Sequence, residues 1–293
     1  MSGQLFVVKT REGNVGDNVL VETSAVSATL APSALNGGRG PGTRAKLAMI
    51  LRDELIDAQE YKAKVDAWQA KKDAFDAYEP ADEEAEGEAG EADNADEDAP
   101  KDPGDPPSRD LRMEALSAVL AGDVPLLVTA NKAQDIDTAL RLAEEFGFTL
   151  WLDSGAEAYL MADALKDANV PVFLHPTMAR PWGDMENMSW TTAGELADAG
   201  LTVMTQSGYE GYVPKVRVVL FEAAIAAVHG WGVERAMAGL TITPARVLGI
   251  DDRVGSIEVG KDGDLALYDG DPFEYTTRCV GTVIEGEVVS DGE

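Results

Sequence analysis

The C-terminal stretch 240–273 decides the fold, and it reads LTITPARVLGIDDRVGSIEVGKDGDLALYDGDPF. Thr243 is a good N-cap, and Pro244 suits the first helical position because its missing N–H would have no partner there. Gly249 then ends the helix, since glycine enters the left-handed region without a steric penalty. The stretch is therefore predicted to begin with a short helix.

Short strands separated by turns are expected after this helix. The pattern predicts strands at 255–259, 264–268, 280–284 and 287–289. Leu265 and Leu267 fall on one face of the second strand, and Glu285-Gly286 forms a two-residue hairpin loop. These strands make a small antiparallel sheet that has too few strands to be stable alone.

Three motifs in this stretch resemble a known C-terminal signature. They are Thr-x-x-Pro-Ala-Arg-x-Leu-Gly-Ile at 241–250, Arg-x-Gly-Ser-Ile-Glu-x-Gly-Lys-Asp-x-Asp-Leu at 253–265 and Asp-Gly-Asp-Pro-Phe at 269–273. The signature is that of the amidohydrolase superfamily, and the nearest likeness is to its imidazolonepropionase-like members. The resemblance implies a segment that ends a (β/α)8 barrel and adds strands to a β-sandwich. It also implies hydrolysis of a non-peptide C–N bond, as in a cyclic amide, by a metal-activated water.

Composition limits the kinds of partner. The 293 residues suit one large or two small domains, and 45% hydrophobic residues can bury a sizeable core. The formal net charge of −29 repels phosphate, so neither nucleic acid nor an anionic membrane is expected as a partner. With no apolar run long enough to span a bilayer and no signal peptide at the start, we expect a cytoplasmic protein, although a missing upstream segment could carry a signal. Cys279 is the single cysteine, which excludes an internal disulfide and a cysteine zinc site.

The first hundred residues contain a long helix and an acidic run. Thr43 can cap a helix over 44–78, whose apolar stripe predicts packing on the barrel or on a second copy: Ala58, Tyr61, Val65, Trp68, Lys72 and Phe75. The acidic insert 79–107 is expected to be solvated and disordered because it has almost nothing apolar to bury. A calcium site there is disfavoured, since the run lacks the ligand spacing of a calcium loop.

Strands and helices alternate from residue 106 onward. Strands are expected at 125–129, 148–152, 171–174 and 201–204, and helices at 109–120, 133–146, 156–168, 192–199, 214–228 and 233–239. Further strands are expected at 5–9, 19–22 and 25–30. Apolar strands alternating with helices predict a parallel sheet covered by helices. The fold class is therefore α/β, an incomplete TIM-type (β/α)8 barrel over 1–240 with a C-terminal piece of a composite β-sandwich over 241–293.

The resemblance assigns the four later strands to barrel strands five to eight and implies that the chain begins part-way through the family's barrel. Relatives hold zinc or another divalent metal with histidines and an aspartate at the strand ends. At the corresponding positions this chain has other residues: Thr129, Asn131, Ser154 and Ser207. Hydroxyls and amides are poor zinc ligands. We therefore expect no metal cofactor, and we expect the metal-dependent reaction to be dead or strongly altered.

Other polar residues follow the same strands and form the candidate site. His175 and Asp153 are candidate catalytic residues that could form an acid/base pair; the alternative for His175 is a polar residue that satisfies loop carbonyls. His229 is expected to cap a helix. The candidate substrate-binding residues are Asn131, Ser154, Gln206, Tyr209 and Arg180. The loop 177–190, rich in Met and Trp, is either a lid over this site or a hydrophobic loop packed on the barrel or a partner.

Two functions remain open at this point, and they differ in class. One is a hydrolase of non-peptide C–N bonds that works with an altered site. The other is a non-catalytic homologue that binds a small molecule, forms a homo-oligomer or pairs with an intact relative. A third explanation of the missing strands is that the chain is a gene fragment.

Overall fold

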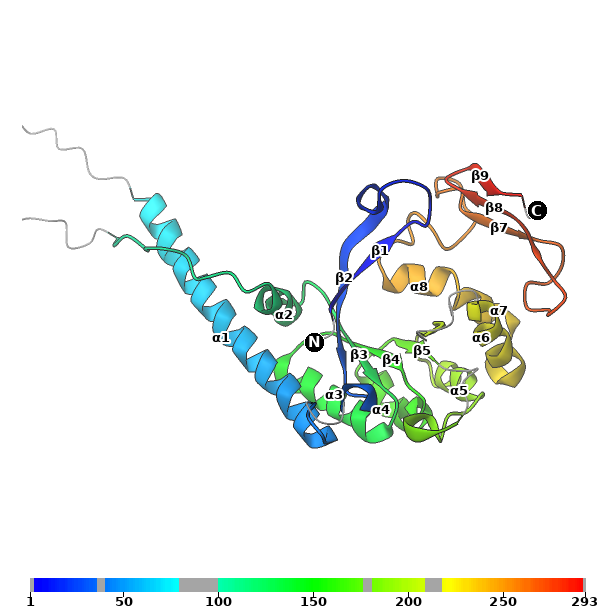
Figure 1. Ribbon diagram of the computed structural model, residues 1–293, viewed down its shortest axis with the longest axis horizontal. Coiled ribbons are helices and arrows are strands. Elements are labelled where there is room, and N and C mark those ends of the chain that lie inside the picture. The colour runs from blue at the N-terminus through cyan, green and yellow to red at the C-terminus, as the bar shows by residue number, and fades with distance from the viewer. Residues whose placement is uncertain (1–2, 36–39, 79–99, 176–180, 209–217, 292–293) are drawn as a thin grey trace, which may run out of the picture.

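The chain forms a curled sheet covered by helices on one side, with a long helix and a small second sheet attached (Figure 1). The computed structural model describes residues 3–35, 40–78, 100–175, 181–208 and 218–291. The predicted fold class is confirmed, because the main sheet is a half-barrel with α/β topology.

Six strands form the main sheet, and they lie in the order in which they occur in the chain. The first pair is antiparallel and the following strands are parallel to one another. The strands are β1 Gly3–Val8, β2 Val19–Thr29, β3 Leu126–Ala130, β4 Leu150–Ser154, β5 Val172–Leu174 and β6 Val203–Thr205. The two strands predicted at 19–22 and 25–30 are therefore one continuous strand.

The helices that cover the sheet follow its strands. They are α3 Ala133–Phe146, α4 Ala162–Asp167, α5 Thr192–Asp198, α6 Val219–Ala226 and α7 Val233–Ala238. Gly147 ends α3 in the left-handed region, at φ 73°, as its place after the last apolar residue predicts. The helix predicted at 156–168 is instead a 3-10 turn, Ala158–Met161, followed by α4.

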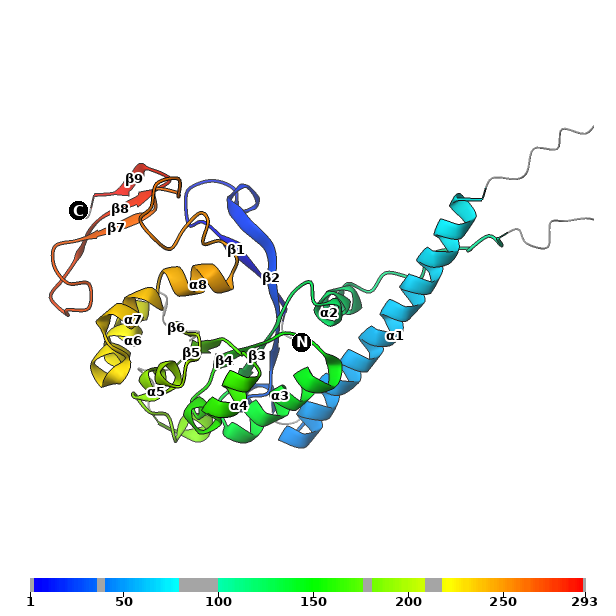
Figure 2. The same ribbon diagram turned by 180° about the vertical axis from the view of Figure 1, so that it is seen from behind.

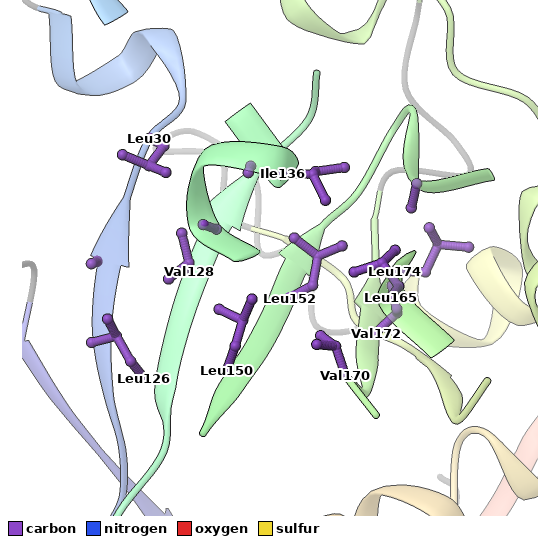
Figure 3. Packing of buried hydrophobic residues seen from close by; sticks show 14 of the residues in the cluster. Leu30, Leu126, Val128, Ile136, Leu150, Leu152, Leu165, Val170, Val172 and Leu174 are labelled. Carbon is purple, nitrogen blue, oxygen red and sulfur yellow. The ribbon is translucent and has the colours of Figure 1, made fainter. Parts of the chain in front are cut away.

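The two faces of the parallel strands differ in character. Val128 and Leu152 point to one face, where they pack with Ile136 of α3 in the main core (Figure 3). Successive side chains of a strand alternate between faces, so Thr129 and Asp153, which are paired across β3 and β4, point to the opposite face. The uncovered face of the half-barrel therefore carries the polar residues.

The long helix and its neighbour form an arm beside the sheet (Figure 2). The helices are α1 Arg44–Asp76 and α2 Leu111–Ala121. Thr43 caps α1 by accepting a hydrogen bond from the Lys46 backbone N–H at 3.2 Å, as predicted. Ala58 of α1 is buried, and farther along α1 the Trp68 Nε1 donates to the Gly104 carbonyl at 3.0 Å. The predicted stripe thus packs on α2 and on the returning chain near Ala58, Tyr61 and Trp68, whereas Phe75 is exposed. Most of the predicted acidic insert lies outside the described residues.

The C-terminal segment contains the remaining helix and a second sheet. They are α8 Ile242–Val247 and the antiparallel strands β7 Leu265–Tyr268, β8 Cys279–Ile284 and β9 Glu287–Ser290. Glu285 and Gly286, both at positive φ, form the predicted two-residue hairpin loop between β8 and β9. No helix among the described residues is long and apolar enough to cross a membrane.

Two predictions for this segment are wrong. Thr243 is not the N-cap: α8 begins at Ile242, two residues earlier than predicted, after Thr241. Pro244 is tolerated there because N–H groups throughout the first turn have no helical partner. The predicted strand 255–259 is not a strand. Gly255, at φ 93°, lies so close to α8 that a Cβ would stand 2.7 Å from the Ala245 Cβ, so the chain bends around the helix there.

A buried lysine joins the two ends of the chain. The Lys9 side chain, 6% exposed, follows β1, and its Nζ lies 2.6 Å from Asp262, 3.1 Å from Asp264 and 3.2 Å from Glu285. Burial lowers the pKa of Lys9, but the hydrogen bonds to these three carboxylates outweigh that effect and raise the pKa overall. The N-terminal hairpin is therefore held to the C-terminal sheet by charge.

Candidate functional site

Polar side chains meet at the carboxyl ends of the parallel strands. Asp153, at the end of β4, accepts a hydrogen bond from the Thr129 hydroxyl at 2.6 Å and another from the Gln206 side-chain amide. Burial raises the pKa of the Asp153 carboxyl, and hydrogen bonds from Thr129, Ser154 and Gln206 offset only part of that rise. One carboxylate oxygen is therefore engaged from the adjacent β3 and the other from the chain that follows β6.

His175 occupies the next strand end and faces α6. Its backbone N–H donates to the Ser154 carbonyl at 3.0 Å, and its Nδ1 lies 3.6 Å from Oε1 of Glu222. Glu222 is completely buried. On the other side of the ring, a Cβ on Gly208 would stand 2.3 Å from Nε2. The imidazole is therefore held between α6 and the chain that follows β6.

A second polar network ties the described part of the predicted lid loop to the rim. Asn131 accepts from the Ala156 N–H and donates to Asp184 of the loop at 2.8 Å. Lys132 bridges Glu157 at 3.0 Å and Glu186 at 2.6 Å. These ion pairs and amide contacts fix residues 184–187 above β3 and β4.

Glu157 is the centre of this rim network. Its carboxylate accepts from the Ala133 N–H, at the start of α3, at 2.8 Å and from the Asn187 side chain at 2.7 Å. Burial raises the pKa of Glu157, but the hydrogen bonds from Ala133, Asn187 and Lys132 outweigh it and lower the pKa overall. An anion at a helix N-terminus is favoured by the helix dipole as well. Glu157 is thus a charged carboxylate that positions the loop.

The structure brings some of the predicted site residues together and separates others. Asp153 and Gln206 are in direct contact, whereas His175 faces Glu222 instead of forming the predicted pair with Asp153. Asn131 belongs to the rim network. Ser154 is buried, at φ 78°, and hydrogen-bonds to Asp153. Tyr209 and Arg180 lie outside the described residues, as does part of the predicted lid, 177–180.

Four residues that sequence reasoning missed complete the picture: Glu222, Lys132, Glu157 and Asp184. Only Glu222 carried a local signal, because it is a lone acid inside the apolar run 219–227. A charge in such a run has to be paired when the helix is buried. The others are ordinary charged residues of loops and helix starts.

The described part of the loop 181–190 exposes its aromatic residues. Trp182 is 71% exposed, and Trp190 is 51% exposed. The Trp190 ring lies 4.8 Å from the ring of His229, which follows α6 in a widened helical turn, Ala227–Trp231. Polar contacts, not Met and Trp side chains, therefore hold this loop on the rim.

Among the residues that the structure describes, no group of three or more His, Cys, Asp or Glu side chains is placed to hold a metal ion.

Comparisons with known proteins agree with the architecture. The model of the family described as "Amidohydrolase family" matches residues 229–290. An amidohydrolase from Thermotoga maritima MSB8 has a similar structure, with a TM-score of 0.78 and 28% identity over 99% of this chain and 68% of that one. The half-barrel and the C-terminal sheet therefore have a solved counterpart along nearly the whole chain.

Curated relatives match shorter parts of the sequence. Imidazolonepropionase from Bacteroides fragilis is 41% identical over 104 residues, which are 31% of this chain and 24% of that protein. Amidohydrolase tasK from Hapsidospora irregularis is 28% identical over 200 residues, 62% of this chain and 19% of that protein. The matches span about a quarter of these relatives or less. Together with the motifs and the fold, they show that the chain belongs to the amidohydrolase superfamily and is similar within it to the imidazolonepropionases.

Proposed function

We propose that this chain keeps the amidohydrolase scaffold without its metal centre, and that the strand ends bind a small polar molecule. The observation that carries the proposal is the state of Asp153. Both of its oxygens accept hydrogen bonds from neighbouring strand ends, Thr129 and Gln206. Its oxygens keep lone pairs that a hydrogen-bonding ligand can use, but no group of three or more His, Cys, Asp or Glu side chains among the described residues is placed to hold a metal ion with it.

The residues at the family's ligand positions support the same proposal. The Thr129 hydroxyl donates a hydrogen bond to Asp153. The Asn131 side chain donates to Asp184 and accepts from the Ala156 N–H. Ser154 is buried and hydrogen-bonds to Asp153. A zinc site needs about three protein ligands, and hydroxyl or amide groups that are already hydrogen-bonded do not replace imidazoles. The donor set of the described residues therefore does not fit a zinc ion.

A hydrogen-bonding ligand suits what remains at the strand ends. Thr129, Asp153 and Gln206 form a chain of donors and acceptors on the uncovered face of the sheet. Asp153 has a raised pKa, so it can donate or accept as the pH changes. The name imidazolonepropionase points to a ring that contains amide-type groups. A cyclic amide is therefore the ligand class that we propose.

A binding and turnover experiment with hydantoin, a simple cyclic amide, tests this proposal. We expect hydantoin to raise the melting temperature of the protein without being hydrolysed, with or without added zinc. The variant Gln206→Ala should lose the stabilisation, whereas Gln134→Ala, at an exposed position of α3, should keep it. Zinc-dependent hydrolysis of hydantoin would contradict the loss of the metal centre.

A metal-independent hydrolase is the second candidate, and a single contact favours it. The buried Glu222 lies 3.6 Å from Nδ1 of His175, an arrangement in which a carboxylate can orient an imidazole that acts as a general base. If the pair works in this way, His175→Gln should abolish hydrolysis of a cyclic amide, and Glu222→Gln should shift its pH profile. Absence of metal-independent turnover in the intact chain would remove this candidate.

We also propose, as a role that needs no turnover, that the chain associates with a second copy or with an intact relative. The three-stranded terminal sheet supports this, because β9 is exposed along its whole length and forms an edge that another strand can join. Light scattering at several concentrations tests the homo-oligomer. A monomer throughout would contradict it.

A further inference from the structure

A large pocket lies between the barrel helices and the terminal sheet, away from the strand ends discussed above. Its volume is about 960 Å³, at the upper end of the roughly 300–1,000 Å³ typical of small-molecule sites. It is bounded by α6, by α8 and the chain that follows α8, by β7 and by the loop that joins β7 to β8. Figure 1 shows these elements around the space between the terminal sheet and α6.

The walls of this pocket are mostly apolar and include three aromatic rings. Leu240, Leu248 and Leu265 contribute aliphatic surface. Phe221 of α6 and Tyr275 of the 269–278 loop face each other with ring centroids 6.4 Å apart, and Tyr268 of β7 also lines the pocket. An apolar body would be desolvated between these walls, and the ring faces would attract a positive charge.

The charged groups of the pocket have one sign. Asp262, Asp264 and Glu274 line it, and none of the described residues that line it is Lys, Arg or His. Asp262 and Asp264 are shared with Lys9, which lies behind them. Glu274 is exposed and is not in a salt bridge with another described residue. It therefore stands beside the aromatic pair as a carboxylate able to meet the charge of a ligand.

From this arrangement we propose a second ligand site, which takes an amphipathic organic cation: an ammonium group attached to an apolar body. The apolar body fills the space between α6 and β7, and the ammonium lies against the Tyr275 ring beside Glu274. This site is separate from the proposed function, because Glu222 faces His175 whereas Phe221, its neighbour on α6, lines the pocket. An anion of the same shape would meet carboxylates and ring faces, so it is excluded.

Calorimetric titration of the full chain with three eight-carbon probes tests the proposal. The probes are octyltrimethylammonium, octan-1-ol and octanoate, at about 0.3 M salt so that long-range attraction by the net charge is screened. We expect one octyltrimethylammonium per chain, bound at least about tenfold more tightly than octan-1-ol and more tightly still than octanoate. Equal affinity for the cation and for octanoate, or no saturable binding of the cation, would overturn the proposal.

Variants locate the bound cation within the molecule. Tyr275→Ala should weaken octyltrimethylammonium about fivefold to thirtyfold, the effect of losing a cation–ring contact. Glu274→Gln should reduce the preference for the cation over octan-1-ol and leave octan-1-ol binding unchanged. Both side chains are exposed, so neither variant should disturb folding.

The matched control is Phe6→Ala, which removes an exposed ring from β1, outside the pocket. It should leave the affinity for octyltrimethylammonium unchanged. If Tyr275→Ala behaves like Phe6→Ala, the cation binds elsewhere and the assignment is wrong. All three variants, Tyr275→Ala, Glu274→Gln and Phe6→Ala, should keep the rise in melting temperature that hydantoin causes. Failure of this cation site and failure of the proposed function can therefore be told apart.

Discussion

Replacing Gly208 by alanine should destabilise the protein by about 2–5 kcal/mol, because two separate penalties combine. Gly208 has φ 64°, and an L-residue in the left-handed region costs about 1–2 kcal/mol. Its new Cβ would also stand 2.3 Å from Nε2 of His175, and relieving such overpacking costs about 1–3 kcal/mol. Because the ring is held on its other side by the buried Glu222, the clash cannot be relieved by a simple rotation.

Urea unfolding of a small set of variants separates these two penalties. Gly147→Ala is the matched control: its φ is 73° and nothing lies within 4 Å of the added Cβ, so only the backbone penalty of about 1–2 kcal/mol should appear. In the double variant His175→Ala/Gly208→Ala the clash is gone, and a coupling of about 1–3 kcal/mol should appear in the double-mutant cycle. If Gly208→Ala and Gly147→Ala have the same effect and the cycle shows no coupling, His175 does not lie against Gly208.

Three further variants test other parts of the structure by urea unfolding. Lys9→Met should cost about 1–3 kcal/mol, since it leaves Asp262, Asp264 and Glu285 without their shared cation. Because the pKa of Lys9 is raised, its contribution to the free energy of unfolding is complete below the unfolded value of 10.5 and is lost above the folded value. The stability difference between Lys9→Met and wild type should therefore shrink only in strong alkali, and an unchanged stability of Lys9→Met at pH 7 would contradict a stabilising role for these ion pairs. Burial raises the pKa of Asp153, so the stability that its protonated form contributes is present below the unfolded value of 3.8 and is lost as the pH rises through the folded value. Asp153→Asn should therefore gain stability relative to wild type as the pH rises from about 4, and a difference that stays constant with pH would refute this. Leu152→Ala, in the fully buried core behind Asp153, should cost about 2–5 kcal/mol, and a loss below about 1 kcal/mol would place β4 wrongly.

Local patterns made much of the fold predictable. The apolar spacing of 133–146 and the glycine after it specify α3 without any knowledge of its neighbours. The hairpin at Glu285 and Gly286 follows from two residues that tolerate positive φ between strand-forming runs. Where tertiary contact decides, the same reasoning fails: residues 255–259 have the composition of a strand, but the close approach of Gly255 to α8 bends the chain.

The contacts of the candidate site could not be predicted for the same reason. Asp153 meets Gln206 and Asn131 meets Asp184, and each pair is 53 residues apart in the chain. No periodicity connects such residues, and only the parallel register of the strands brings their ends together. The identity of the residues at the family's ligand positions was readable from the motifs. Their hydrogen-bond partners, which decide what those residues can still bind, were not.

The most direct test of the account is the metal content of the purified full chain after incubation with excess zinc and removal of unbound ion. The account predicts well under one zinc per chain by elemental analysis, in wild type and in Asp153→Asn alike. One or more zinc ions per chain in wild type, lost in Asp153→Asn or His175→Ala, would show that these strand ends hold a metal after all.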